Sequence, residues 1–192
     1  IPRSLKVLES YAFADCHSIT TLVWKPFDCN MGANKVEHFD AESNFYYRCF
    51  SLKKVIVDDA VEHLPPCVFA GMLYCEDIVL PNTIRELPSD FATESDSLNE
   101  IKLPDSLRYI AHGAFYYSGI ERIVIPDKTE ALGSYSFSYC PNLREVDIGS
   151  GMKRIDIYAF NIDYNLQTMT VRCKVPPVMQ PNSLFEIPES AV

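Results

Sequence analysis

A residue pattern recurs along the chain at a nearly constant interval, and this repeat restricts the fold more than any other feature. One position of the pattern is aromatic in every copy but one. The residues at this position are Phe13, Tyr46, Phe69, Ala92, Phe115, Phe137 and Phe160, with successive spacings of 33, 23, 23, 23, 22 and 23 residues. Units of this size cannot each bury their own apolar side chains, so they gain stability by stacking on one another. The sequence predicts a solenoid of about seven turns.

Each copy also contains a short segment in which apolar and variable residues alternate, as in Ile123–Pro126. A period of two predicts a strand with one buried face. Proline follows the segment at Pro81 and Pro104 as well, and it ends the strand because it has no backbone donor. We expect the strands to form a parallel sheet on the concave side. The aromatic segments should return along the convex side as short 3₁₀ or irregular structure.

The repeat resembles the BspA-like leucine-rich repeats, a 23-residue class found in bacterial cell-surface proteins. Ala12–Cys16 and Ala114–Ser118 look like the A-F-x-x-C core of that family, and Ile101–Pro104 looks like its I-x-I-P strand. The resemblance covers roughly nine-tenths of the chain, and a repeated motif is more specific than a single match. It implies a leucine-rich repeat solenoid, a β-rich right-handed coil of the α/β type.

The tail Val171–Pro177 resembles the segment that often follows the last repeat in this family. We therefore expect a repeat array over residues 1–173 and a capping tail over 174–192. The chain opens in mid-pattern without an initiator methionine, which favours a fragment or mature product of a longer protein.

Ten extra residues lengthen the second copy, and we expect an insertion within residues 25–45. Long loops on a rigid solenoid often carry binding residues. Two interpretations without a binding role are favoured over a binding loop. The segment is either a neutral insertion or an irregular repeat that packs Phe27 and Met31 over a neighbouring turn.

The charge of the chain limits its partners. Seventeen basic and 26 acidic residues give a net charge of −9, which argues against nucleic acid or anionic lipid as a main partner. No run of eighteen apolar residues occurs, so we expect no transmembrane segment. The partner is expected to be a protein or a glycan, and the chain a monomer.

The sequence gives little sign of catalysis, and we expect neither an enzyme nor a cofactor or metal site. His63 and Cys67 could suggest a cysteine-dependent enzyme, but Pro65 and Pro66 separate them and no orienting asparagine lies nearby. Asp58 and the following Asp59 are most simply a solvated turn, because no full set of calcium ligands is visible.

Three of the seven cysteines, Cys16, Cys49 and Cys140, share one repeat position. They could form a ladder of ligands or disulfides between turns. An inward row of small side chains is the favoured interpretation, because free cysteine behaves as a small buried hydrophobe. Tyrosines also cluster beside the core aromatics, on the expected convex side. Stacking on sugar rings is conceivable there, although a scattered row of surface tyrosines is more common.

The outward strand positions form the expected binding face. Val23, Ile56 and Val79 would make an apolar strip on adjacent turns, and such strips often mark an interface. Opposite charges on neighbouring turns could equally be structural. The full set of candidate binding residues is Val23, Lys54, Ile56, Asp77, Val79, Glu100, Lys102, Arg122, Val124, Glu145 and Asp147.

Two functions are compatible with these features. A solenoid offers an extended rigid surface, so the leading hypothesis is a non-catalytic module that binds a macromolecule through the concave face. The family resemblance implies a bacterial surface or secreted protein and an adhesive role. The alternative is a structural spacer or accessory domain that displays another domain of a longer chain.

Overall fold

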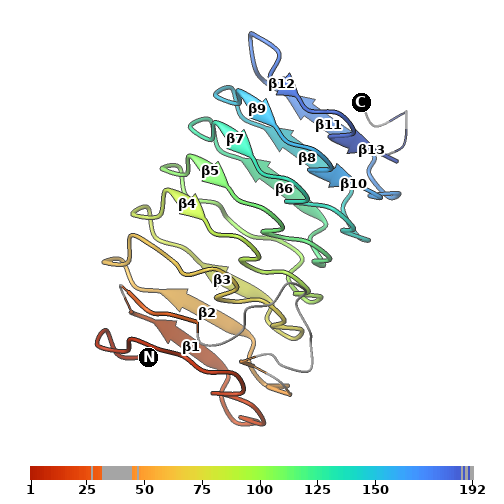
Figure 1. The fold of residues 1–192 in the computed structure, drawn as a ribbon. Helices are drawn as coiled ribbons and strands as arrows, with labels where there is room; N and C mark the ends of the chain where they lie inside the picture. Colours follow the sequence, from red (N-terminus) through yellow and green to blue (C-terminus); the bar gives the residue numbers. More distant parts are fainter. Residues whose placement is uncertain (27, 32–44, 47, 187, 189, 191–192) are drawn as a thin grey trace.

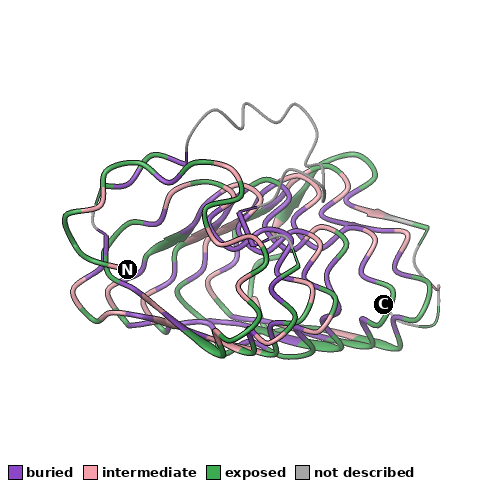
Figure 2. Cartoon of the chain, turned by 90° about the horizontal axis from the view of Figure 1, so that it is seen from below, coloured by how far each residue is buried: buried purple, intermediate pink, exposed green. Residues whose placement is uncertain are grey.

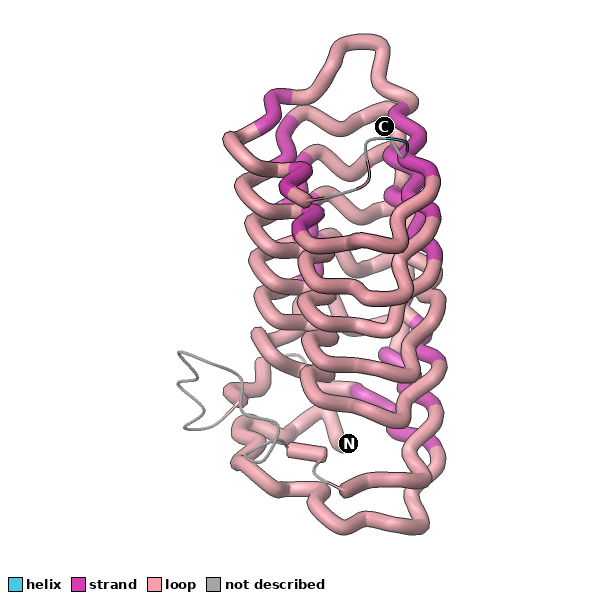
Figure 3. Tube along the Cα trace, turned by 90° about the vertical axis from the view of Figure 1, so that its right-hand side faces the viewer, coloured by secondary structure: helices cyan, strands magenta, loops and turns pink. Residues whose placement is uncertain are grey.

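The chain forms a solenoid of stacked rungs that runs from the N-terminus at one end to the C-terminus at the other (Figures 1 and 3). Strands and turns account for nearly all regular structure in the part described. A computed structural model describes residues 1–26, 28–31, 45–46, 48–186, 188 and 190.

The predicted alternating segments are parallel strands, and they form two sheets of three. The sheet orders are β1-β2-β3 and β11-β8-β6. Each strand pairs with its equivalent in the next rung, as in Leu22 with Val55 and Ile123 with Val146. A single bridge from Glu100 to Arg122 extends the second sheet. The strands are β1 (Thr21–Trp24), β2 (Lys54–Val57), β3 (Asp77–Val79), β6 (Arg122–Ile125), β8 (Glu145–Ile148) and β11 (Thr168–Val171).

A five-stranded parallel sheet, which was not predicted from the sequence, lies in the other arm of the rungs, with the order β12-β9-β7-β5-β4. Each strand has only two residues, and in β4, β5, β7 and β9 the second residue is buried. Two residues are too few to show a period of two, so this sheet gave no signal in the sequence. The strands are β4 (Glu86–Leu87), β5 (Tyr109–Ile110), β7 (Ala131–Leu132), β9 (Arg154–Ile155) and β12 (Val178–Met179).

The aromatic segment of each rung is a run of consecutive turns with a regular backbone pattern. Residues two before and two after the core aromatic have positive φ, as at Tyr135 (58°) and Tyr139 (59°). Alternate amides point to the next rung: those of Tyr135, Phe137 and Tyr139 donate to its carbonyls at 3.3, 2.9 and 2.8 Å. The intervening amides close local turns. Every second backbone donor therefore links two rungs, which explains how this irregular segment stacks in register.

The core aromatics form the predicted internal spine, with one substitution. Phe115 stacks on Phe137 at a centroid distance of 5.1 Å, and Phe137 on Phe160 at 5.3 Å. In the fourth copy, Phe91 fills the gap that Ala92 leaves, because its ring packs 5.5 Å from Phe69 and 5.7 Å from Phe115. Buried stretches line the inside of the stacked rungs (Figure 2).

The tail continues the ladders of the array. Two-residue strand β13 (Leu184–Phe185) pairs in parallel with β10 (Phe160–Asn161), and β12 pairs with β9. The buried Ser183 hydroxyl donates to the Ile155 carbonyl at 3.0 Å. These contacts close the last rung of the array, and the division at residue 173 stays a prediction.

The repeat continues into the segment where the insertion was expected. Asn30 bridges to Val7, 23 residues earlier, and its amide and carbonyl both bond to that rung. Met31 is buried, as the irregular-repeat interpretation requires. The described residues 28–31 thus continue the repeat. Phe27 and residues 32–44 lie outside the described residues.

One rung is shorter than the others, and a glycine makes this possible. The aromatic spacing falls to 22 residues between Phe115 and Phe137 because the turn between Ser118 and Ile120 contains one residue, whereas the equivalent turn of the preceding rung contains two. The single residue in the shortened turn is Gly119. A Cβ there would lie 1.9 Å from the Asp96 carbonyl oxygen of the preceding rung.

We expect Gly119→Ala to lower the free energy of unfolding by about 2–4 kcal/mol, because backbone atoms must move to relieve the clash. Urea unfolding followed by circular dichroism measures this effect. Ser97→Ala, in the equivalent turn one rung earlier, is the matched control and should change stability little. A Gly119→Ala protein as stable as the parent would contradict the tight packing of the shortened turn.

Candidate functional site

The outward face of β1, β2, β3, β6, β8 and β11, here called the strand face, carries the residues that the sequence analysis selected. The strip of Val23, Ile56 and Val79 is continuous, because strand pairing places Val23 opposite Ile56 and Ile56 opposite Val79. Val79 is 40% exposed, and the other two are half-buried. Three branched side chains therefore lie side by side at the surface of adjacent rungs.

The same outward row is more polar toward the C-terminal end of the array. Val124 is 43% exposed and pairs with Asp147, which pairs with Thr170. The Arg172 guanidinium lies 2.9 Å from the Asp147 carboxylate. Val23, Ile56, Val79, Val124 and Asp147 thus share one outward row, and only its N-terminal half is apolar over consecutive rungs.

Several of the predicted charged residues pair with each other across neighbouring rungs. Lys54 contacts Asp77 at 2.6 Å, and Arg122 contacts Glu145 at 3.3 Å. All four side chains remain substantially exposed, so each pair contributes only about 0–1 kcal/mol to stability. These contacts agree with a structural role for the opposite charges on neighbouring rungs. They also hold the charges in fixed positions beside the apolar strip.

Glu100 and Lys102 stand between the two three-stranded sheets. Both are exposed, and Glu100 joins the second sheet through its bridge to Arg122. Ile101 and Leu103, which alternate with them, are buried. This segment therefore keeps the inward and outward alternation of the neighbouring strands although it forms no regular strand itself.

The row of cysteines lies inside the array, as predicted, and all seven cysteines of the chain are free. Cys49 and Cys140 are buried, and Cys16 is half-buried. The Cys140 thiol donates to the Phe115 carbonyl at 3.2 Å, and burial raises its pKa. The Cys49 and Cys140 thiols, which donate to the Phe13 and Phe115 carbonyls, thus act as small core side chains.

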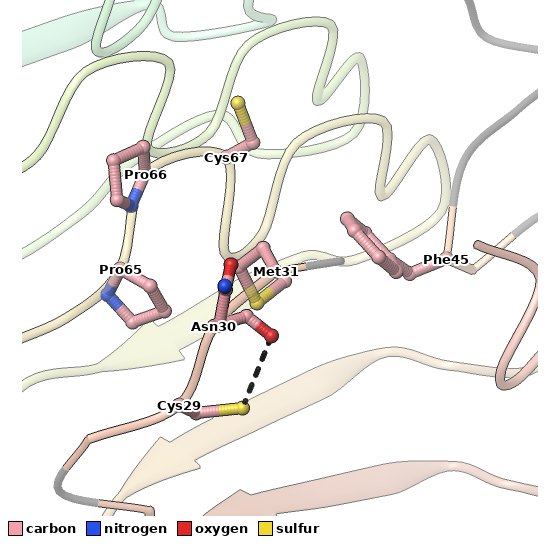
Figure 4. A pocket seen from close by; sticks show the side chains of 7 residues that line it. All are labelled: Cys29, Asn30, Met31, Phe45, Pro65, Pro66 and Cys67. Atoms are coloured by element: carbon pink, nitrogen blue, oxygen red, sulfur yellow. Dashed lines mark hydrogen bonds between the residues drawn. The ribbon is translucent and has the colours of Figure 1, made fainter. Parts of the chain in front are cut away.

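The pairing of His63 with Cys67, considered as a thiol nucleophile, gains no support from the geometry. Cys67 lines a cavity of about 260 Å³, shown in Figure 4. Burial, with a smaller contribution from Asp90, raises the pKa of its thiol to about 11, so the thiolate needed for attack is scarce at neutral pH. His63 is exposed. The other residues of the cavity are Cys29, Asn30, Met31, Phe45, Pro65 and Pro66.

Asp58, considered for calcium binding, has protein partners. Its carboxylate accepts from the Ala60 amide at 3.2 Å and contacts the Arg3 guanidinium at 2.9 Å. These hydrogen bonds lower the pKa of the carboxyl group, with the Ala60 amide as the largest cause. Within the residues that the structure describes, no three histidine, cysteine or acidic side chains gather as metal ligands.

Tyrosines gather at the turns that precede the strands, where Tyr117 is exposed and Tyr116 and Tyr139 are half-buried. Tyr116, Tyr117 and Tyr139 contact one another with ring centroids 5.5–5.7 Å apart. These tyrosines belong to the surface row expected from the sequence. Tyr164, which is 64% exposed, and Asn165 were not predicted, and they line a cavity with Tyr117 and Tyr139. Their repeat position varies in residue type, so periodicity gave no signal for them.

Comparison with known proteins gives a family match and several similar folds. The family model of the BspA type leucine rich repeat region matches in six copies, over residues 1–91 and 40–167. No curated protein matches the chain. In the part of the chain described, no helix is long and apolar enough to cross a membrane.

Three solved structures illustrate the shared fold. A leucine-rich repeat protein from T. pallidum is 23% identical with a TM-score of 0.60, over 95% of this chain and 71% of that one. One from Bacteroides ovatus is 18% identical with a TM-score of 0.53, over 74% and 45%. A leucine rich cell surface protein from Faecalibacterium prausnitzii is 17% identical with a TM-score of 0.51, over 85% and 58%. The chain thus spans less than two thirds of the length of the last two.

Proposed function

This chain belongs to the BspA-type leucine-rich repeat family, and we propose that it is a non-catalytic recognition module that binds a macromolecule through its strand face. Repeats of this kind generally serve as protein-interaction modules. A stacked array presents a long rigid surface whose side chains are fixed by the rungs beneath. The partner is a protein or a glycan, and the module acts as a monomer.

The observation that carries this proposal is the apolar strip of Val23, Ile56 and Val79. Strand pairing holds the three side chains in line on adjacent rungs, where they remain in contact with solvent. The Lys54–Asp77 ion pair lies beside the strip. An apolar centre with a charged border is the arrangement that protein interfaces use.

The proposed setting is the surface of a bacterial cell or its surroundings, with adhesion to host or neighbouring cells as the role. The family and the neighbour described as a cell surface protein support this setting. The net charge of −9 agrees with a partner other than nucleic acid.

The second candidate function is a spacer or accessory domain that displays another domain. The ion pairs between rungs favour it, because they satisfy several outward charges within the array itself. In this case the strand face would have no preferred ligand.

An Ile56→Asp, Val79→Asp double variant distinguishes the two functions. Two carboxylates in the apolar strip would have to lose water on binding, so we expect capture of a surface-protein or glycan partner to fall at least about tenfold. Pull-down from bacterial and host-cell surface extracts, quantified against the unmodified chain, measures this loss.

Val178→Asp is the matched control, because Val178 is an exposed valine on β12 in the other sheet. Its capture should equal that of the unmodified chain. Equal capture by all three proteins would instead favour the spacer function.

A further inference from the structure

A small cavity lies between successive rungs near the C-terminal end of the array, outside the strand face. Its volume is about 220 Å³, which suits one ring-sized group better than a peptide segment. It is formed where the aromatic turns lead into the strands that follow. The residues that line it are Tyr117, Tyr139, Pro141, Ile162, Tyr164 and Asn165.

Tyrosine rings supply half of the residues that line this cavity, which is partly open to water. The rings of Tyr117 and Tyr139 stack 5.6 Å apart at an angle of 13°. Tyr117 is 49% exposed, and Tyr164 is more exposed still. A tyrosine ring offers a flat apolar face together with a hydroxyl group. Such a face matches a ligand whose own surface is apolar on one side and polar at its edges.

Two polar side chains are held in place by hydrogen bonds: Asn165 lines the cavity, and Glu186 contacts the lining residue Tyr164. The Tyr164 hydroxyl donates to the Glu186 carboxylate at 2.9 Å. The Asn165 side-chain amide donates to the Pro141 carbonyl at 2.6 Å, which directs its own carbonyl oxygen elsewhere. A carboxylate and an amide carbonyl can each accept further hydrogen bonds. These two side chains thus suit a ligand that carries several hydroxyl donors.

Tyr117 and Tyr139 have φ of 58° and 59°, at the repeat position that Gly71 occupies in an earlier rung. The same position has positive φ at Asp15, Arg48, Glu94 and Ile162, so this conformation belongs to the repeat and does not by itself mark a site. Glycine adopts it without steric cost, so a glycine substitution can remove a ring here while the backbone keeps its course.

We propose that this cavity binds one sugar ring of a neutral glycan. The apolar face of a pyranose would stack on the tyrosine rings, and its hydroxyls would donate to Glu186 and Asn165. The Glu186 carboxylate and the net charge of −9 disfavour acidic sugars. This site is separate from the strand face, so it does not depend on the function proposed above.

Saturation-transfer NMR with the full chain tests the proposal. The probes are maltohexaose, cellohexaose, mannohexaose and chitohexaose, each at about 5 mM to detect weak binding. We expect saturation transfer to at least one probe. Tyr139→Gly should weaken its binding at least about tenfold, because it removes a ring while glycine keeps the positive φ. Tyr164→Ala should do the same, and its exposed side chain can be removed without unfolding the chain.

Glu94→Gly is the matched control, because Glu94 has the same repeat position and a φ of 54° but does not line the cavity. It should bind the probe as the unmodified chain does. The Ile56→Asp, Val79→Asp variant should also bind normally, which separates this site from the strand face. Absence of transfer to all four probes would overturn the proposal, and so would equal losses in Tyr139→Gly and Glu94→Gly.

Discussion

Phe115→Ala is expected to lower the free energy of unfolding by about 3–5 kcal/mol, the range for removing a fully buried phenylalanine. Phe115 is completely buried between Phe91 and Phe137, in the middle of the spine. The cavity cannot close easily, because the backbone amide of Phe115 is fixed to the Ser136 carbonyl of the next rung at 2.8 Å. Chemical denaturation followed by circular dichroism measures the loss.

A double-mutant cycle with Phe137→Ala tests whether the spine acts through contacts between rungs. The two stacked rings should show a coupling energy of about 0.5–1.5 kcal/mol. Tyr117→Ala serves as the control within the same turn, because that side chain is half-exposed and its loss should cost far less. A loss of under about 1 kcal/mol in Phe115→Ala would contradict the spine as a main source of stability.

The fold was largely predictable because its main signal is repeated. An aromatic residue every 23 positions and alternating strand segments depend on burial, which acts in the same way in each rung. Phe91 shows where such a signal fails. The spacing points to Ala92, but the ring of the neighbouring Phe91 fills the same space in the core. A core tolerates such an exchange when the volume and shape of the buried side chains are kept.

The five-stranded sheet and the functional surface were less predictable, for different reasons. Two-residue strands such as β5 and β7 are defined by hydrogen bonds between rungs, which leave no periodic pattern in the sequence. The strand face could be predicted, because alternation fixes which residues point outward. The cavity beside Tyr164 could not, because it depends on side chains at positions where each rung differs from the next.

Asp163 has the largest increase among the carboxyl groups whose pKa is raised. It should make the protein less stable as the pH rises. It occupies the position of Cys140 in the following rung and is completely buried. One carboxylate oxygen accepts from the Cys140 amide at 2.8 Å, and the other, Oδ2, is buried without a hydrogen-bond partner. Burial raises the pKa of the carboxyl group to about 8, and the single amide bond offsets this only in part.

The direction of the pH dependence follows from proton binding. Above pH 4 the unfolded chain loses the Asp163 proton, whereas the folded chain keeps it until about pH 8. Within this window the folded state binds more protons, so stability falls by up to about 1.4 kcal/mol per pH unit. Below the window both states are protonated, and above it both are ionised, so the contribution no longer changes.

Asp163→Asn should therefore raise the free energy of unfolding at pH 8 by about 1–3 kcal/mol and flatten its decline between pH 4 and 8. The amide oxygen can still accept from Cys140, and an unpaired amide nitrogen costs less than a buried charge. Thermal and urea unfolding at pH 4, 6 and 8 measures both effects. Asp105→Asn, at an exposed position, should leave the pH profile unchanged. If the Asp163→Asn profile were parallel to that of the parent, the carboxyl group would have to be ionised in the folded protein, and its burial could not be the cause of any decline in stability.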